Sequence, residues 1–110
     1  MLMIYLRIHE SENGVIIAMC DQGLIDSVIE DGEVVIDIKA YSGFYKGSLV
    51  EPSKVSFAGE KIYSVNAIGK ESIELAVREG VIDESSVSVA GGIPYAHAYS
   101  FIPPSQGPGR

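Results

Sequence analysis

The chain has 110 residues, a length that fits one domain and leaves no room for a second full core. Apolar residues make up 46% of it, enough to bury a core. The net charge of −7 argues against indiscriminate binding to nucleic acid or anionic lipid, because affinity for phosphate comes mainly from positive charge. The single cysteine, Cys20, excludes an intramolecular disulfide framework and any multi-cysteine zinc or iron–sulfur cluster.

The beginning of the chain does not have the pattern of a targeting signal. The apolar run from Met1 to Leu6 is short, and Arg7, His9 and Glu10 follow at once. No run approaches the roughly 18 apolar residues of a membrane span. We therefore expect a cytoplasmic protein that does not contact a membrane, and a lone cysteine fits a reducing compartment.

The first twenty residues predict a β-hairpin. Residues 2–9 alternate between apolar and polar side chains, the period of a half-buried strand. Asn13-Gly14 supplies the turn, and the apolar run from Val15 to Cys20 is typical of a strand in the middle of a sheet.

The next segments predict a helix, a strand and a loop. Asp21 is placed to cap a short helix over residues 22–29, whose apolar positions form a stripe. Residues 33–39 alternate as a third strand, with three apolar side chains directed inward: Val34, Ile36 and Ile38. Residues 41–47 contain two glycines and three rings and predict a loop, and a short helix or turn runs from Pro52 to about Phe57.

The second half of the chain contains the clearest helix. A short strand over residues 62–65 precedes a helix over 70–79, where Gly80 is placed to end it in a Schellman motif. Residues 86–90 and 95–102 predict two further strands.

We therefore predict a single globular α+β domain over residues 1–102. An N-terminal hairpin would join a mixed or antiparallel sheet that two to three short helices cover. Residues 103–110, rich in proline and glycine, predict a flexible tail.

The order and spacing of several segments resemble an archaeal family known only as domain of unknown function 424. The likeness runs from Val15 to His97 and rests mainly on these segments: Cys20-Asp21, the strand Glu33 to Ile38, Phe44-Tyr45-Lys46-Gly47, Asn66-Ala67-Ile68-Gly69, Val81-Ile82-Asp83 and Ala90 to His97. The sequence departs from the family pattern at Gly91-Gly92 and in its longer end from Ala98 to Arg110. The resemblance implies a cytoplasmic archaeal protein and carries no established activity.

Few residues suggest catalysis or metal binding. Cys20 and His97 are the weak catalytic candidates, because a thiol needs an imidazole within hydrogen-bond reach to become a nucleophile. The alternative is a buried cysteine that acts as a small apolar residue, beside an unrelated histidine. The acidic residues between Asp21 and Asp37 match no metal-binding spacing and are typical of a solvated edge. We expect no metal and no cofactor.

Residues 66–70 lead into the predicted helix over 70–79. A glycine before a helix N-terminus is typical of phosphate cradles, but the Walker and three-glycine patterns are absent. The alternative is a helix cap at which Gly69 allows close packing.

The middle of the chain concentrates positive charge and aromatic rings. Residues 39–70 carry five lysines against two acids, whereas residues 8–37 carry eight acids and neither Lys nor Arg. Rings on which bases stack, beside lysines that contact phosphate, are typical of single-stranded RNA recognition. The predicted ligand-binding residues are Tyr41, Phe44, Tyr45, Lys46, Asn66, Lys70, Tyr95 and His97. The alternative is that the rings fill a core and the lysines only solubilise the surface.

Three functional hypotheses follow. The first is a non-catalytic module that binds RNA or a ribonucleoprotein, with the acidic residues 8–37 facing solvent or a basic protein partner. The second is a protein–protein adaptor or homo-oligomer that associates through a sheet edge. The third is a small-substrate enzyme that uses Cys20 and His97. The sequence leaves the oligomeric state open.

Overall fold

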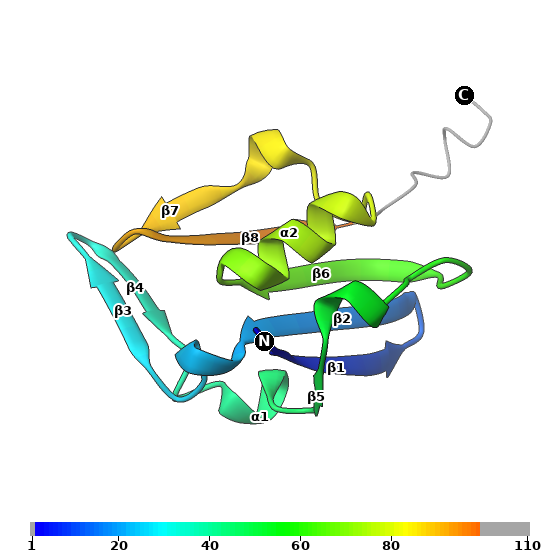
Figure 1. Ribbon diagram of the computed structural model, residues 1–110, viewed down its shortest axis with the longest axis horizontal. Helices are drawn as coiled ribbons and strands as arrows, with labels where there is room; N and C mark the ends of the chain where they lie inside the picture. Colours follow the sequence, from blue (N-terminus) through cyan, green and yellow to red (C-terminus); the bar gives the residue numbers. More distant parts are fainter. Residues whose placement is uncertain (1, 100–110) are drawn as a thin grey trace.

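The computed structural model describes residues 2–99, which form a six-stranded sheet, a separate two-stranded hairpin and two α-helices (Figure 1). The six-stranded sheet has the order β5 (Ser48–Val50), β1 (Ile4–Ser11), β2 (Gly14–Asp21), β6 (Ile62–Ile68), β8 (Ile93–Tyr99) and β7 (Ser88–Ala90). The hairpin consists of β3 (Val28–Asp31) and β4 (Val34–Asp37), and the helices are α1 (Ser42–Tyr45) and α2 (Lys70–Arg78). Three short 3-10 helices are η1 (Gln22–Leu24), η2 (Pro52–Lys54) and η3 (Glu84–Ser86).

The six-stranded sheet is mixed. β2 and β6 run parallel at its centre, and the other neighbouring strands pair antiparallel. This arrangement confirms an α+β fold with a mixed sheet. The predicted tail over residues 103–110 and the end of the predicted strand 95–102 lie outside the described residues. Among residues 2–99, no helix is long and apolar enough to cross a membrane.

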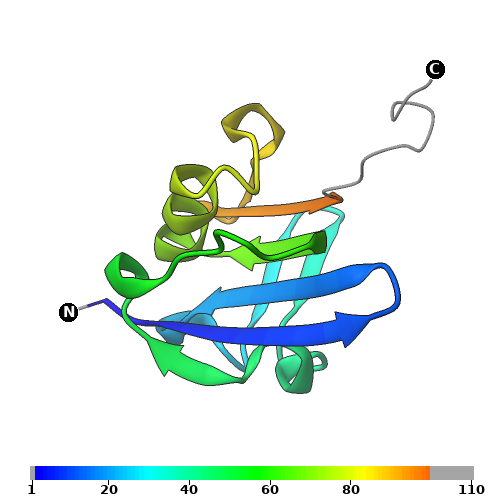
Figure 2. The same ribbon diagram turned by 90° about the vertical axis from the view of Figure 1, so that its right-hand side faces the viewer.

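The structure has three layers, with the sheet in the middle. Figure 2 shows α2 on one side of the sheet and α1 with the β3–β4 hairpin on the other. Under α2 lies the α2-side core, whose largest fully buried members are Ile4, Ile17, Met19, Val65 and Leu75. Behind the sheet lies the hairpin-side core, which consists of Ala18, Cys20, Ile29, Ile38, Tyr45, Ile68 and Ala90.

The predicted end of the long helix is confirmed. Gly80 has a φ of 72°, in the left-handed region that favours glycine. Its N–H donates to the Val77 carbonyl at 3.0 Å, and the N–H of Val81 donates to the Ala76 carbonyl at 3.0 Å. These two bonds are those of a Schellman motif, and they satisfy carbonyls that the helix itself leaves open.

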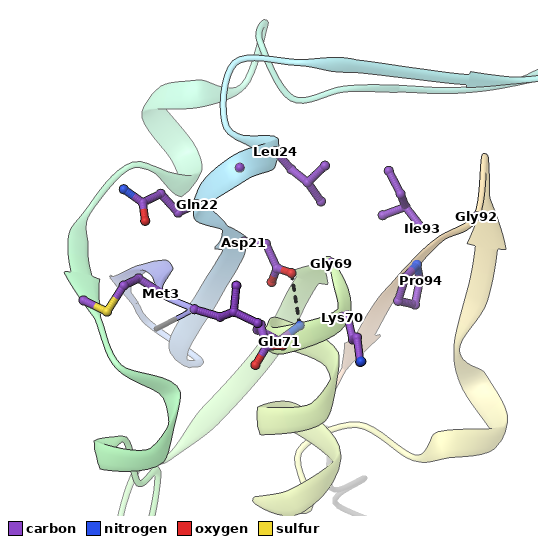
Figure 3. A pocket seen from close by; sticks show the side chains of 12 residues that line it. Met3, Asp21, Gln22, Leu24, Gly69, Lys70, Glu71, Gly92, Ile93 and Pro94 are labelled. Carbon is purple, nitrogen blue, oxygen red and sulfur yellow. Dashed lines mark hydrogen bonds between the residues drawn. The ribbon is translucent and has the colours of Figure 1, made fainter.

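The carboxylate of Asp21 joins the end of β2 to the beginning of α2. The parallel register pairs Cys20 with Ile68, so that Asp21 lies beside Gly69, the residue before α2. Asp21 accepts a hydrogen bond from the N–H group of Glu71 at 3.0 Å (Figure 3). It accepts two more from Ser72, from the N–H group at 2.8 Å and from the hydroxyl at 2.9 Å. A Cβ at Gly69 would collide with this carboxylate, so the contact requires glycine.

The predicted helix over residues 22–29 is wrong. Only η1 forms there, and Asp26 adopts a φ of 66°, which ends a right-handed helical run. Val28 and Ile29 then pair with Asp37 and Ile36 in the β3–β4 hairpin. Strand pairing has overridden the local helical stripe, and the Asp21 side chain caps α2 instead of this segment.

Three smaller corrections concern the middle of the chain. The predicted loop over residues 41–47 contains the single turn of α1, and β5 was not predicted at all. The hairpin strand β4 leaves Val34 exposed instead of directed inward, because Val34 pairs with Asp31 at the turn end of the hairpin. Ile38, two residues after Ile36 on the predicted strand, is buried as expected.

We predict that Asp21→Ala lowers the free energy of unfolding by about 1 to 2 kcal/mol, because two backbone donors of α2 lose their acceptor. The measurement is urea denaturation followed by circular dichroism. The matched control is Asp83→Ala, since Asp83 caps only the exposed turn η3, through Ser85. Equal losses of stability in the two variants would contradict a special role for Asp21.

Candidate functional site

A groove of about 620 Å³ opens on the face of the sheet opposite α2. We call it the aromatic groove. Rings stand on two of its sides, and the centre of the sheet forms its floor. Its lining residues are Ile16, Tyr41, Phe44, Tyr45, Tyr63, Ser64, Asn66, His97 and Tyr99. A volume of this size is in the usual range of small-molecule sites.

The first wall of the aromatic groove comes from α1 and the residue before it. The rings of Phe44 and Tyr45 meet edge to face, with centroids 5.0 Å apart. Tyr45 is buried in the hairpin-side core, and burial raises the pKa of its hydroxyl to about 12. Tyr41 is 65% exposed. The wall therefore has a fixed base and an accessible ring at its rim.

β1 holds this wall in place. Arg7 donates from Nη1 to the Gly43 carbonyl at 2.8 Å, and His9 donates from Nε2 to the Phe44 carbonyl at 2.9 Å. The His9 ring also stacks on Phe44, with centroids 4.8 Å apart and an interplanar angle of 10°. A Cβ at Gly47 would collide with the β1 backbone, so glycine is needed where the chain leaves α1.

The second wall comes from β6 and β8. The His97 and Tyr99 rings lie 4.9 Å apart on β8, and Tyr63 meets Tyr99 edge to face at 5.4 Å. The register between β2 and β6 shifts at this point, since Val15 pairs with Ile62 and Ile16 with Ser64. Tyr63 is the extra residue of this bulge, and bulges commonly redirect a side chain.

The floor of the aromatic groove is the polar part of the central strands. On β6, Ser64 pairs with Ile16 and Tyr99, while Asn66 pairs with Ala18 and His97. Ser64 is buried and Asn66 is half-buried. A ligand in the groove would therefore meet hydroxyl and amide groups between two aromatic walls.

The lining of the aromatic groove contains neither Asp nor Glu, although the chain carries a net charge of −7.

The five lysines between residues 39 and 70 are spread over different parts of the structure. Lys39, Lys46 and Lys61 lie within two residues of lining positions in the chain. Lys54 belongs to η2. Arg78 of α2 donates hydrogen bonds to the carbonyls of Pro52 and Val55 at the two ends of this turn, so η2 lies on the α2 side of the sheet, away from the groove. Lys70 begins α2. The five lysines therefore do not form one continuous surface.

Five of the eight predicted ligand-binding residues line the aromatic groove: Tyr41, Phe44, Tyr45, Asn66 and His97. Tyr95 instead packs against the hairpin-side core. The ammonium group of Lys46 lies 4.0 Å from the carboxylate of Asp26. Because both side chains are half exposed to solvent, this ion pair contributes little to stability. Lys70 lies in a different pocket.

The four lining residues outside the predicted set are Ile16, Tyr63, Ser64 and Tyr99. Tyr99 follows the period-two pattern of Tyr95 and His97, so the sequence contained a signal for it. Tyr63 lies in the groove because of a bulge, which the sequence does not indicate.

The second pocket lies at the beginning of α2 and measures about 420 Å³ (Figure 3). It contains Lys70, Gly69 and the Gly92-Ile93-Pro94 segment. Here a phosphate cradle would need free N–H groups at the start of the helix. The N–H groups of Glu71 and Ser72 already donate hydrogen bonds to the carboxylate of Asp21. This carboxylate therefore occupies the place that a phosphate would take at the start of the helix.

The structure does not bring Cys20 and His97 together. Cys20 pairs with Ile68 and His97 with Asn66, and β6 separates their two strands. Two strand spacings alone amount to roughly 10 Å, well beyond hydrogen-bond reach. Burial, followed by the charges of Asp21 and Asp26, raises the pKa of the Cys20 thiol to about 12. This geometry does not activate a nucleophile. Among residues 2–99, no group of three or more metal-ligating side chains gathers.

The fold and the groove define a small α+β protein with a ring-lined site on one face of a mixed sheet. A family model described as "Protein of unknown function (DUF424)" matches residues 8–101, and the chain belongs to this family. The crystal structure of an uncharacterized conserved protein from Methanopyrus kandleri has a similar fold, with a TM-score of 0.71 and 23% identity. The match covers 92% of this chain and 98% of that chain. The search of curated proteins found no match.

We predict that Cys20 is alkylated very slowly by iodoacetamide in the native protein near pH 8. A thiol with a pKa of about 12 instead of 9.0 holds roughly a thousandfold less thiolate, and burial also blocks access. Mass spectrometry over time gives the rate, and the same protein unfolded in guanidinium is the control. Native labelling as fast as unfolded labelling would contradict this account.

Proposed function

We propose that this protein is a non-catalytic binding module that holds unpaired bases of RNA in the aromatic groove. The observation that carries the proposal is the composition of the groove: aromatic walls on two sides, a polar floor and no acidic side chain. The absence of a paired nucleophile at Cys20 favours binding over catalysis.

Stacking is the first support. Unpaired bases stack on Tyr, Phe and His rings, and each contact is worth about 1–3 kcal/mol. Tyr41 and Tyr99 expose 65% and 60% of their surface on the two walls of the groove. These rings remain accessible to a base, whereas rings that only fill a core would be covered.

Charge is the second support. The chain as a whole would repel phosphate, but no carboxylate lines the groove, and three lysines adjoin its lining in the chain. If Lys39, Lys46 and Lys61 each neutralise one phosphate, the logarithm of affinity should fall with the logarithm of salt concentration at a slope of about −2. The proposal therefore implies modest affinity that depends mainly on stacking.

A second candidate function is association with a basic protein. The β3–β4 hairpin exposes Val28, Val34 and Val35 by 42% to 59%, beside Glu30 and Glu33. Sheet edges offer less, because β5 and β7 at the ends of the six-stranded sheet have three residues each. A molar mass that rises with the concentration of this protein alone in light scattering would favour self-association over binding of a basic partner.

We predict that Tyr41→Ala and Tyr99→Ala each weaken binding of labelled single-stranded RNA by about tenfold, because each removes one stacking surface. Fluorescence anisotropy at low and moderate salt measures the affinity. The matched control is Val89→Ala on β7, a side chain 63% exposed outside the groove, which should leave affinity unchanged.

The competing results are distinct. Duplex RNA of the same sequence should bind far more weakly, since its bases are already paired and stacked. No binding of single strands at low salt would overturn the proposal. Equal weakening by the control variant and the two tyrosine variants would remove the groove as the site.

A further inference from the structure

We propose that the Arg7 guanidinium binds a backbone phosphate of the strand whose base occupies the aromatic groove. This inference rests on the proposed function and assigns a cation that contacts the backbone. Arg7 lies on β1, and its side chain is on the groove side of the sheet, where it contacts α1. A guanidinium suits phosphate because it is planar, always charged and able to bind phosphate oxygens in bidentate fashion.

Arg7 makes no ion pair within residues 2–99. Carboxylates are plentiful in this chain, which has 15 acidic residues against 8 Lys and Arg. The ion pairs of the described residues are those of Lys46, Lys54 and Arg78. The Arg7 side chain is nevertheless exposed to solvent. A phosphate that approaches Arg7 would therefore not have to displace a carboxylate of the described residues.

Two glycines fix the course of the Arg7 side chain and leave its charged end uncovered. Nη1 of Arg7 donates to the Gly43 carbonyl at 2.8 Å, which uses one donor of the planar fork and leaves the others available. A Cβ at Gly47 would come within 2.8 Å of the Arg7 Cβ, so glycine is needed for the two segments to lie this close. A side chain that is already ordered loses less conformational entropy when it binds a ligand.

The position of Arg7 places its charge beside the first wall of the aromatic groove. Gly43, which Arg7 contacts, directly precedes Phe44, and Phe44 lines the groove. The register pairs Arg7 with Ala18 and Ala18 with Asn66, so Arg7 begins a row across the sheet that reaches the polar floor. Two strand spacings, roughly 10 Å, separate the backbones at the two ends of this row, a distance within the length of a few nucleotides.

The lysines near the groove are less suited to this contact. An ammonium group is compact, strongly hydrated and carried on a flexible stem. Lys46 also has the carboxylate of Asp26 at 4.0 Å. The Arg7 charge is instead held in place by its hydrogen bond to Gly43. Loss of Arg7 should therefore weaken binding more than loss of Lys46.

The test measures binding of a labelled uridylate octamer to the full chain at several salt concentrations. Each neutralised phosphate of a single strand contributes about −0.7 to the slope of log affinity against log salt. We expect Arg7→Gln to weaken binding about fivefold at low salt and to make this slope shallower by about 0.7. Arg7→Lys keeps the charge, so its slope should stay at the wild-type value. Lys54→Gln is the matched control, because it removes one charge on the α2 side of the sheet.

The salt slope separates a phosphate contact from a purely structural role. If Arg7 only held α1 in place, Arg7→Gln would weaken binding equally at every salt concentration, and that result would overturn the proposal. Unchanged binding by Arg7→Gln, or an equal change of slope in Lys54→Gln, would also overturn it. Circular dichroism shows whether each variant is folded, and the uncharged Arg7→Met takes the place of Arg7→Gln if that variant does not fold. Absence of binding by the wild type at low salt would instead contradict the proposed function itself.

Discussion

The arrangement of this protein depends on one half-buried junction, in which the Asp21 carboxylate accepts three hydrogen bonds from the first turn of α2. The junction forms because β2 and β6 are parallel neighbours, which brings the end of one strand beside the beginning of the helix that follows the other. It also satisfies N–H groups that every helix leaves open at its start. α2 is thereby fixed over one face of the sheet, and the hairpin and α1 are left to cover the opposite face.

The two faces of the sheet are covered to different extents. Under α2, apolar side chains such as Ile17, Met19 and Val65 are fully buried. On the other face, the hairpin and α1 cover only the end that contains Cys20 and Ile68, and the aromatic groove occupies the rest. If this face of the sheet served only to pack against other parts of the chain, its floor would be expected to carry apolar residues. The floor of the aromatic groove instead has Ser64 and Asn66. The polar floor is the reason to look for a ligand here.

Local patterns predicted the elements that local interactions determine. The N-terminal hairpin followed from alternation and Asn13-Gly14, and the end of α2 followed from Gly80. Long-range pairing decided the rest. The helix expected after Asp21 was lost to pairing between β3 and β4, and Asp21 itself serves a helix fifty residues away in the sequence. Register between strands also separated Cys20 from His97, and a bulge brought Tyr63 into the groove; neither is encoded in a short stretch of sequence.

The central claim is that the ring-lined face of the sheet receives an unpaired base. Nuclear magnetic resonance of the labelled protein tests it most directly, by mapping chemical-shift changes on addition of a short adenylate oligonucleotide. The account predicts that the largest changes fall on Tyr63, Asn66 and His97, while α2 and the pocket at its beginning stay unchanged. Changes centred on Lys70 and Gly92, or none at low salt, would contradict it.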